Sequence, residues 1–387
     1  MKKLIGGFAA LALAGGLAFA DVEISFYNKV YMEDAFFGHD DEADKDIKQF
    51  SPIKDKFDFA LESEKVSGEV KGIVSFMDFG GETYGIFGEL KDAWVEFRPI
   101  EQIGIAFREN IVAWPSTLPI YDDDLQSGNI GSEGFTLWYA PSPLKGALKL
   151  AATVPFGWIN GDSSLSSEAN YFNGKDENDD DNRFNFGLGA IYSHEFFEVG
   201  FSAGNIINND KRKLGVTVGF SNLFGAVEGL NIGFGYENNK ATDGYGDFIN
   251  YMTVVAGVAG ENIFDAVVTY ERKAFAVTAE AVTNFSEDTD TGNATHDLYA
   301  GLEFDLHLTE NLTLALSGRI ASDFTKDDKA IDEEGNPTES ALKNAYMAGV
   351  GVLFALGEHH EFGVGFESGI QNKNYGFAIP VSWKYTY

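Results

Sequence analysis

Three consecutive aspartates stand in the middle of a long polar segment, WPSTLPIYDDDLQSGNIGS, residues 114–132. Asp122, Asp123 and Asp124 directly follow Ile120 and Tyr121. A run of carboxylates therefore adjoins apolar residues that can pack against the rest of the protein. Clustered carboxylates attract cations and orient polar solutes at a constriction. The segment is therefore the first candidate for a permeation site, with a solvated outer loop as the alternative.

The acidic runs do not have the spacing of a calcium loop. An EF-hand loop needs glycine at its sixth position and glutamate at its twelfth. None of the runs that begin at Asp122, Asp176 and Asp288 has both residues. We therefore expect no specific metal site and no cofactor, only weak binding of cations at the surface.

Catalytic chemistry has little support in this sequence. The chain has no cysteine, which excludes a thiolate nucleophile and a cysteine-based metal site. A hydrolase site needs a nucleophile within hydrogen-bond reach of a base, and the base needs an orienting group. His307 and Ser317 would lie close together on neighbouring strands, but a polar pair in a wall is the simpler interpretation. We expect no enzyme activity.

The elements that must position these residues are β-strands, because period two dominates the sequence. In DLYAGLEFDLHL, residues 297–308, apolar side chains alternate with Asp, Tyr, Gly, Glu and His. Such runs extend over about ten residues, the length that a tilted strand needs to cross a bilayer. One face of each run is continuously apolar and the other is too polar for a packed interior. One face therefore meets lipid and the other meets water.

Short and long connections alternate along the chain, which is typical of outer-membrane barrels. The predicted long, acidic connections are residues 33–54, 113–132, 158–182, 239–247, 286–295 and 323–342. The pattern predicts an all-β fold: a transmembrane antiparallel up-and-down β-barrel of about 18 strands, with 16 as the alternative. In the ambiguous stretch 246–273 we expect one strand, residues 262–272, and place 248–258 in a loop or strand extension.

The same alternation assigns charged residues to the polar face. The acidic residues there are Asp92, Glu96, Glu198, Glu237, Glu280, Glu303, Asp305 and Glu367, and the basic ones are Arg98, Arg108, Lys149, Arg183, Lys213, Arg319 and Lys384. We select Arg108, Arg319, Glu280 and Glu303, with the Tyr121–Asp124 segment, as permeation residues. Opposed acids and bases would produce a transverse field, and a ring of acids would favour cations. The alternative is that each charge pairs with a neighbour in the wall.

The first twenty residues, MKKLIGGFAALALAGGLAFA, have the basic tip, apolar run and small-residue exit of a secretory signal. We expect cleavage after Ala20, with a membrane anchor as the alternative, and a single barrel domain over residues 21–387. Cleavage removes two lysines, so Lys+Arg falls from 28 to 26 against 60 Asp+Glu, a formal charge of −34. Such a charge excludes nucleic acid as a partner.

The last residues, GFAIPVSWKYTY, form an alternating strand that ends on an aromatic residue. With the strand and loop pattern, this ending resembles the bacterial outer-membrane β-barrels, and among them the general porins. The resemblance implies that Trp383, Tyr385 and Tyr387 are the signal for insertion by the barrel-assembly machinery. It further implies a bacterial outer-membrane location, contact with outer-membrane lipid, and a possible homotrimer.

The expected function is a porin, a water-filled channel for passive diffusion of small hydrophilic solutes and ions. The charge of −34 predicts a preference for cations. One alternative is a substrate-selective channel, for example for sugars, with stacking residues at Tyr27, Tyr31, Trp94, Trp138 and Tyr299. Another is a structural or adhesive barrel whose loops carry the activity.

Overall fold

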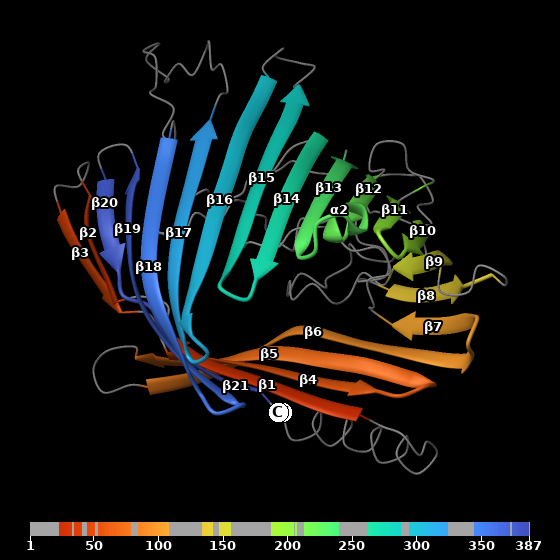
Figure 1. The fold of residues 1–387 in the computed structure, drawn as a ribbon, viewed down its shortest axis with the longest axis horizontal. Helices are drawn as coiled ribbons and strands as arrows, with labels where there is room; N and C mark the ends of the chain where they lie inside the picture. Colours follow the sequence, from red (N-terminus) through yellow and green to blue (C-terminus); the bar gives the residue numbers. More distant parts are fainter. Residues whose placement is uncertain are drawn as a thin grey trace, which may run out of the picture.

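The chain forms a single β-sheet that curves round to meet itself (Figure 1). The structure is a computed structural model, and it describes residues 23–32, 35–40, 45–50, 53–78, 84–107, 134–141, 147–155, 187–204, 206, 213–239, 262–287, 294–323, 344–371 and 374–386. Residues 1–22 lie outside this description, so the predicted signal peptide and its cleavage after Ala20 stay predictions.

The elements follow one another almost entirely as strands. They are β1 (Glu23–Met32), β2 (Ala35–Asp40), β3 (Lys45–Phe50), β4 (Ile53–Glu62), β5 (Val66–Asp78), β6 (Tyr84–Ile100), β7 (Ile103–Phe107), β8 (Gly134–Tyr139), β9 (Leu148–Pro155), β10 (Gly187–His194), β11 (Phe197–Gly204), β12 (Lys213–Phe220), the short helix α2 (Asn222–Gly225), β13 (Leu230–Asn239), β14 (Asn262–Arg272), β15 (Phe275–Glu287), β16 (Ala294–Thr309), β17 (Leu312–Asp323), β18 (Asn344–Leu356), β19 (His360–Gln371), β20 (Asn374–Ala378) and β21 (Val381–Thr386).

These segments build 18 wall strands. β1 pairs with β21 and β4, while β2 pairs with β20 and β3. The segments β1 and β2 therefore form one interrupted wall strand, as do β3 with β4 and β20 with β21. All these pairings are antiparallel, and β5 to β19 each pair with the next strand in the chain. The pairing of β1 with β21 closes the barrel, as in Val30 opposite Trp383. The predicted antiparallel barrel of about 18 strands is confirmed.

One predicted connection is wrong. Residues 33–54 were expected to be a long loop, but β2 and β3 occupy much of that range and pair over Ala35–Phe50. The residues of β2 and β3 extend the wall because their backbone groups find hydrogen-bond partners in each other and in β20.

The apolar face of each strand points outward. Large apolar side chains on β8, β16, β18 and β19, among them Leu137, Leu302, Val350 and Phe366, are exposed on the outer surface. Their neighbours in sequence face the interior of the barrel, as period two requires. The outer apolar residues form the band that lipid covers in barrels of this kind.

The described turns between 63–65, 101–102, 195–196, 273–274, 310–311 and 357–359 are short, and they lie at the same end as Glu23 and Thr386. We call this the turn end. The turn after β12 is longer and contains α2, where Asn222, Leu223 and Phe224 all have positive φ. Within the described residues, no helix is both long and apolar enough to span a membrane.

Candidate functional site

The inner face of the barrel carries two walls of different charge. What we call the basic wall comprises the inward-facing residues of β21, β1, β4, β5, β6 and β9, which lie side by side except for the two intervening strands β7 and β8. Its basic residues are Lys384, Lys29, Lys54, Lys56, Lys71, Arg98 and Lys149. Asp58, Glu69 and Glu96 lie among them. Their inward direction follows from the outward direction of alternating neighbours such as Ile24, Ile53 and Trp383.

The acidic wall, as we define it, comprises the inward-facing residues of β13 to β19. Its described carboxylates are Glu237, Asp265, Glu271, Glu280, Glu303, Asp305, Glu361 and Glu367, and Arg319 is the arginine among the described inward-facing side chains of these strands. The side chains of Glu237, Asp265 and Glu280 are buried. The two walls adjoin where β19 pairs with β21, and both face the interior of the barrel; a transverse field between them stays a prediction.

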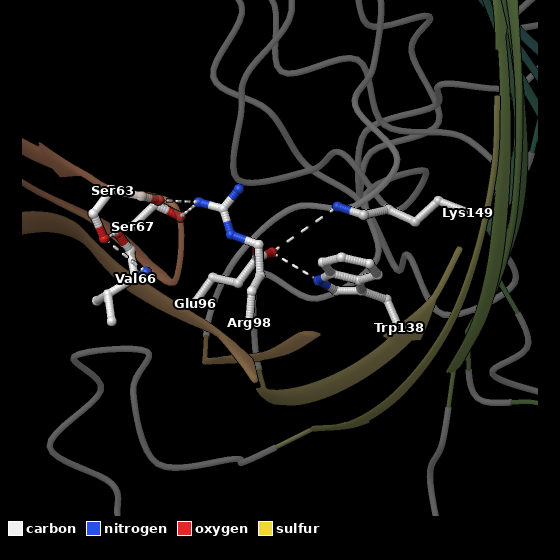
Figure 2. A network of polar contacts seen from close by, with 7 residues as sticks. All are labelled: Ser63, Val66, Ser67, Glu96, Arg98, Trp138 and Lys149. Carbon is white, nitrogen blue, oxygen red and sulfur yellow. Dashed lines mark hydrogen bonds and ion pairs between the residues drawn. The ribbon is translucent and has the colours of Figure 1, made fainter. Parts of the chain in front are cut away.

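Glu96 is the centre of a polar network on the basic wall (Figure 2). Its carboxylate accepts a 2.7 Å hydrogen bond from Trp138 Nε1 and lies 3.1 Å from Arg98 Nε and 3.9 Å from Lys149 Nζ. Only 3% of Glu96 is exposed, so these contacts replace its lost hydration. One carboxylate thus holds two cations and an indole in fixed positions.

The two cations of this network have further contacts that orient them. Arg98 Nη2 donates to the carbonyl oxygen of Ser63 at 3.0 Å and to Ser67 Oγ at 3.1 Å, which fixes the guanidinium near the turn end. Lys149 Nζ lies 4.3 Å from the ring centroid of Trp138, a cation–π arrangement. Two positive charges against one carboxylate leave the cluster with a net positive charge.

Gly104 makes the Trp138–Glu96 contact possible. Trp138 on β8 reaches Glu96 on β6 by crossing β7, and Gly104 lies opposite Trp138 in the register. A Cβ at Gly104 would overlap the indole. The absence of a side chain there allows the ring to lie flat on the wall.

Smaller polar contacts stabilise the rest of the basic wall. Lys71 Nζ lies 2.7 Å from Glu69 Oε2, which also accepts a 3.0 Å hydrogen bond from Trp94 Nε1. Lys384 Nζ lies 5.6 Å from the centroid of the Tyr27 ring. Aromatic residues therefore contact charged side chains at three places along this wall.

The predicted permeation residues fall into two groups. Arg319 and Glu303 lie together on the acidic wall with 3.3 Å between Nη2 and Oε1, and Glu280 lies in the same cross-strand row as Arg319, with Gly301 between them. Arg108, Tyr121, Asp122, Asp123 and Asp124 lie outside the described residues, as do the acidic runs 176–182 and 288–293. The role of all these residues in permeation stays a prediction.

The aromatic ending takes part in closing the barrel. Trp383 stacks on Phe362 with ring centroids 6.3 Å apart and on His360 at 5.8 Å, and its Nε1 donates to His360 Nδ1 at 3.2 Å. The Tyr385 ring lies 5.0 Å from that of His360. Tyr387 lies outside the described residues.

The register of β16 and β17 does not place His307 opposite Ser317, the pair that a hydrolase site would need. His307 lies opposite Thr313, with 3.0 Å between Nδ1 and Oγ1, and Ser317 lies opposite Glu303. The expected arrangement of His307 as a polar wall residue fits this contact.

The sequence analysis placed Glu96, Arg98, Lys149 and Trp138 on the inner face but did not select them as a site. Their mutual contacts cross three strands and depend on the register, which alternation alone does not define. The signal that could have suggested them is Gly104, a glycine on the inner face of a predicted strand, since such a glycine often marks a close approach.

Comparison with known proteins supports the fold. The sequence matches no protein-family model and no curated protein. Similar solved structures include OccK1 (OpdK) of Pseudomonas aeruginosa, at 10% identity over 95% of this chain and 99% of that chain, with a TM-score of 0.53. Another is the anion-selective porin from Comamonas acidovorans, at 11% identity over 95% of this chain and 100% of that chain, with a TM-score of 0.50. At such identities the likeness concerns the fold.

The closed barrel, its apolar outer band and these neighbours define the class of the protein. The chain has the fold of the bacterial outer-membrane porins, and its location is the bacterial outer membrane.

Proposed function

We propose that this protein is a porin, a water-filled channel through which small hydrophilic solutes and ions cross the outer membrane by passive diffusion. The observation that carries the proposal is a closed barrel of 18 strands whose inner face is charged. Barrels of 16 to 18 strands are wide enough to leave an aqueous channel. Inward glycines such as Gly233, Gly235, Gly349 and Gly351 add little bulk to that lumen.

The proposal includes a preference for cations. It is supported by the formal charge of −34 after removal of residues 1–20 and by the excess of carboxylates on the acidic wall. The anion selectivity in the name of the Comamonas acidovorans porin is a property of that protein. The comparisons therefore lend no support to cation preference, which rests on the charges of this chain alone.

Conductance across a planar bilayer tests both parts. The purified protein should give stable open steps, and in a salt gradient the reversal potential should have the sign of a cation-preferring pore. A stable conductance with the opposite sign would overturn the cation preference and leave the porin proposal intact. A folded barrel without conductance, which instead binds a surface ligand, would overturn the porin proposal in favour of an adhesive role.

The sugar-channel alternative receives less support from the geometry. Trp138 is 4% exposed and Tyr299 is fully buried, so neither ring offers a free face for stacking. Trp94 Nε1 is engaged by Glu69. We accordingly propose a diffusion channel rather than a sugar-selective one, and we propose no enzyme activity.

We further propose that Trp383, Tyr385 and Tyr387 are read by the barrel-assembly machinery and that the barrel associates as a homotrimer. A polar pair on the outer face supports association. Asn28 Nδ2 donates to Asp55 Oδ1, and both side chains share the outward parity of Ile24 and Ile53. Ionisable groups that face lipid are costly, so contact with a second copy would relieve this cost. Native mass spectrometry would show trimers, and Asp55→Val should favour monomers.

A further inference from the structure

The turn between β12 and β13 has a backbone conformation that its residue types do not favour. Asn222, Leu223 and Phe224 have φ values of 50°, 37° and 60°, and Gly225 follows at 75°. These values lie in the left-handed region, which is costly for residues that have a Cβ and is normally visited by single residues, not by three in succession. Such backbone outliers persist only where the surrounding structure holds them, and they cluster at functional positions.

Several contacts hold this backbone in place. Gly229 N donates a hydrogen bond to Asn222 Oδ1 at 2.7 Å, and Asn222 N donates to Asn231 Oδ1 at 3.1 Å. Gly225 lies against Phe196 of the neighbouring turn, where a Cβ would come within 2.6 Å of the ring. The turn is therefore fixed both to β13 and to the turn beside it.

The fixed turn presents the ring of Phe224 on the outer side of the wall. This ring is 57% exposed, and its centroid lies 4.7 Å from that of Phe220. Phe220 has the same parity on β12 as Val216, which is exposed on the outer surface, and it lies opposite Ile232 on β13. Phe224 therefore continues the apolar outer band at the turn end of the barrel.

The composition of this turn differs from that of the short turns at the same end. Residues 221–227 have no charged side chain, and we call this segment the apolar turn. Each of the short described turns contains Glu or Lys; they are residues 63–65, 101–102, 195–196, 273–274, 310–311 and 357–359. Charged turns are suited to water, whereas an uncharged turn with an exposed phenylalanine is suited to an apolar surrounding.

We propose that the apolar turn is a membrane anchor, which inserts Phe224 among the acyl chains just below the lipid headgroups at the turn end. Short turns of such barrels lie on the periplasmic side, so the anchor enters the periplasmic leaflet. The occupant is lipid because Phe220 joins Phe224 to the lipid-covered band and because the turn offers no charge to a partner in water. Burial of the ring in lipid offsets part of the cost of the left-handed backbone. The anchor goes beyond the porin proposal and does not depend on conduction.

The test makes use of the absence of cysteine from the chain, because Phe224→Cys then provides one thiol for a nitroxide spin label. The labelled barrel is reconstituted in phosphatidylcholine vesicles, and collisions of the label with oxygen, which concentrates in hydrocarbon, and with a water-soluble nickel chelate are measured. The matched control is Lys273→Cys, in the exposed turn between β14 and β15. The ratio of oxygen to nickel accessibility should be on the order of tenfold higher at position 224 than at position 273, because the two reagents partition oppositely between apolar and aqueous surroundings.

Two other outcomes would overturn the anchor. Equal accessibility ratios at the two positions would place Phe224 in water, where its exposed ring is available to a soluble protein partner. Low accessibility of position 224 to both reagents, together with spin–spin broadening of the spectrum, would mean that a second copy of the chain covers the ring.

The role of the left-handed backbone is tested by adding Asn222→Ala to the labelled variant. This change removes the acceptor for Gly229 N, so the turn should relax and the accessibility ratio at position 224 should fall toward that of the control. Ser221→Ala is the matched change, because it keeps the 2.9 Å hydrogen bond from Ser221 N to the carbonyl oxygen of Phe196 and should leave the ratio unchanged. Equal ratios in these two variants would overturn the positioning role of the turn. Circular dichroism confirms that each variant is folded.

Unfolding from lipid vesicles gives a second measurement that needs no label. Phe224→Ser should raise the equilibrium constant for unfolding on the order of tenfold, the effect of losing part of the burial of one aromatic ring. Phe224→Leu keeps an apolar side chain in the lipid and should raise this constant clearly less. Equal effects of serine and leucine at position 224 would show that an apolar side chain is not needed there, and would overturn the anchor.

Discussion

The contact between Trp138 and Glu96 depends on one residue that takes no part in it. Gly104 occupies the strand between them, and the indole lies where a Cβ would be. The buried Glu96 in turn holds Arg98 and Lys149. The position of two lumen cations therefore depends on the missing side chain of a glycine.

Gly104→Ala should destabilise the barrel by about 1–3 kcal/mol, because the added methyl group displaces a packed indole. Gly219→Ala on β12 is the matched control, since a Cβ there meets no atom within 4 Å. The control should be neutral or slightly stabilising, as an unstrained glycine replacement usually is. Urea unfolding from lipid vesicles measures both. Equal unfolding midpoints for the two variants would contradict the role given to Gly104.

At the scale of single residues, the sequence predicts whether a side chain faces inward or outward but not which side chains it contacts. Alternation placed Glu96, Arg98, Lys149 and Trp138 on the inner face, where the structure has them. It left open which charges meet, because a carboxylate can pair along its own strand, across one strand or across two. Arg98 lies two residues from Glu96 on β6, whereas the distance of Glu96 to Lys149 follows from the register of β6 to β9, which is a property of the assembled sheet.

The closing strand is the element on which the barrel depends most. β21 pairs with β1 on one side and with β19 on the other, so the last strand of the chain joins both ends of the sheet. Pro380 interrupts it between β20 and β21, and the carbonyl oxygen of Pro380 accepts a 2.9 Å hydrogen bond from Gly365 N. The wall thus tolerates a residue that lacks an N–H donor.

Trp383→Ala should lower the yield of folded barrel, because it removes the stacking on Phe362 and His360, worth about 0.5–1.5 kcal/mol for each aromatic pair. Trp383→Phe retains the stacking and loses only the hydrogen bond to His360. It should therefore recover most of the yield. The fraction of heat-modifiable barrel on a gel after refolding into detergent measures both variants. Equal yields for Trp383→Ala and the wild type would refute this account of closure.

Sequence reasoning found the wall strands because a strand with one face in lipid and one in water alternates strictly. It failed at residues 33–54, where β2 and β3 extend a hairpin beyond the region of clear alternation. The strand structure of this hairpin comes from backbone pairing of β2 with β3 and with β20, which composition does not predict.

The molecule as a whole combines an apolar exterior with an interior divided by charge. The division follows the chain: the described basic residues of the lumen are mostly on the first strands, on β9 and on the last strand, and the carboxylates on β13 to β19. The closing pair β1–β21 brings both termini of the sheet to the basic wall. The net charge of the chain therefore does not reveal that the inner face has two regions of different charge, which adjoin where β19 pairs with β21.

The outer band makes the most direct prediction about the whole molecule, which is that its stability depends on depth in the bilayer. Leu302 and Leu308 lie on the same face of β16 and are 50% and 54% exposed, but Leu308 is next to the turn end. Leu302→Lys should destabilise the barrel by about 2–4 kcal/mol, whereas Leu308→Lys should cost about 0–1 kcal/mol, because lysine is tolerated near the interface and not deep in hydrocarbon. Equilibrium unfolding in lipid vesicles gives both values. In a detergent micelle the difference should shrink. A soluble β-sheet protein would show no such dependence, so equal costs in vesicles would argue against a membrane-spanning barrel.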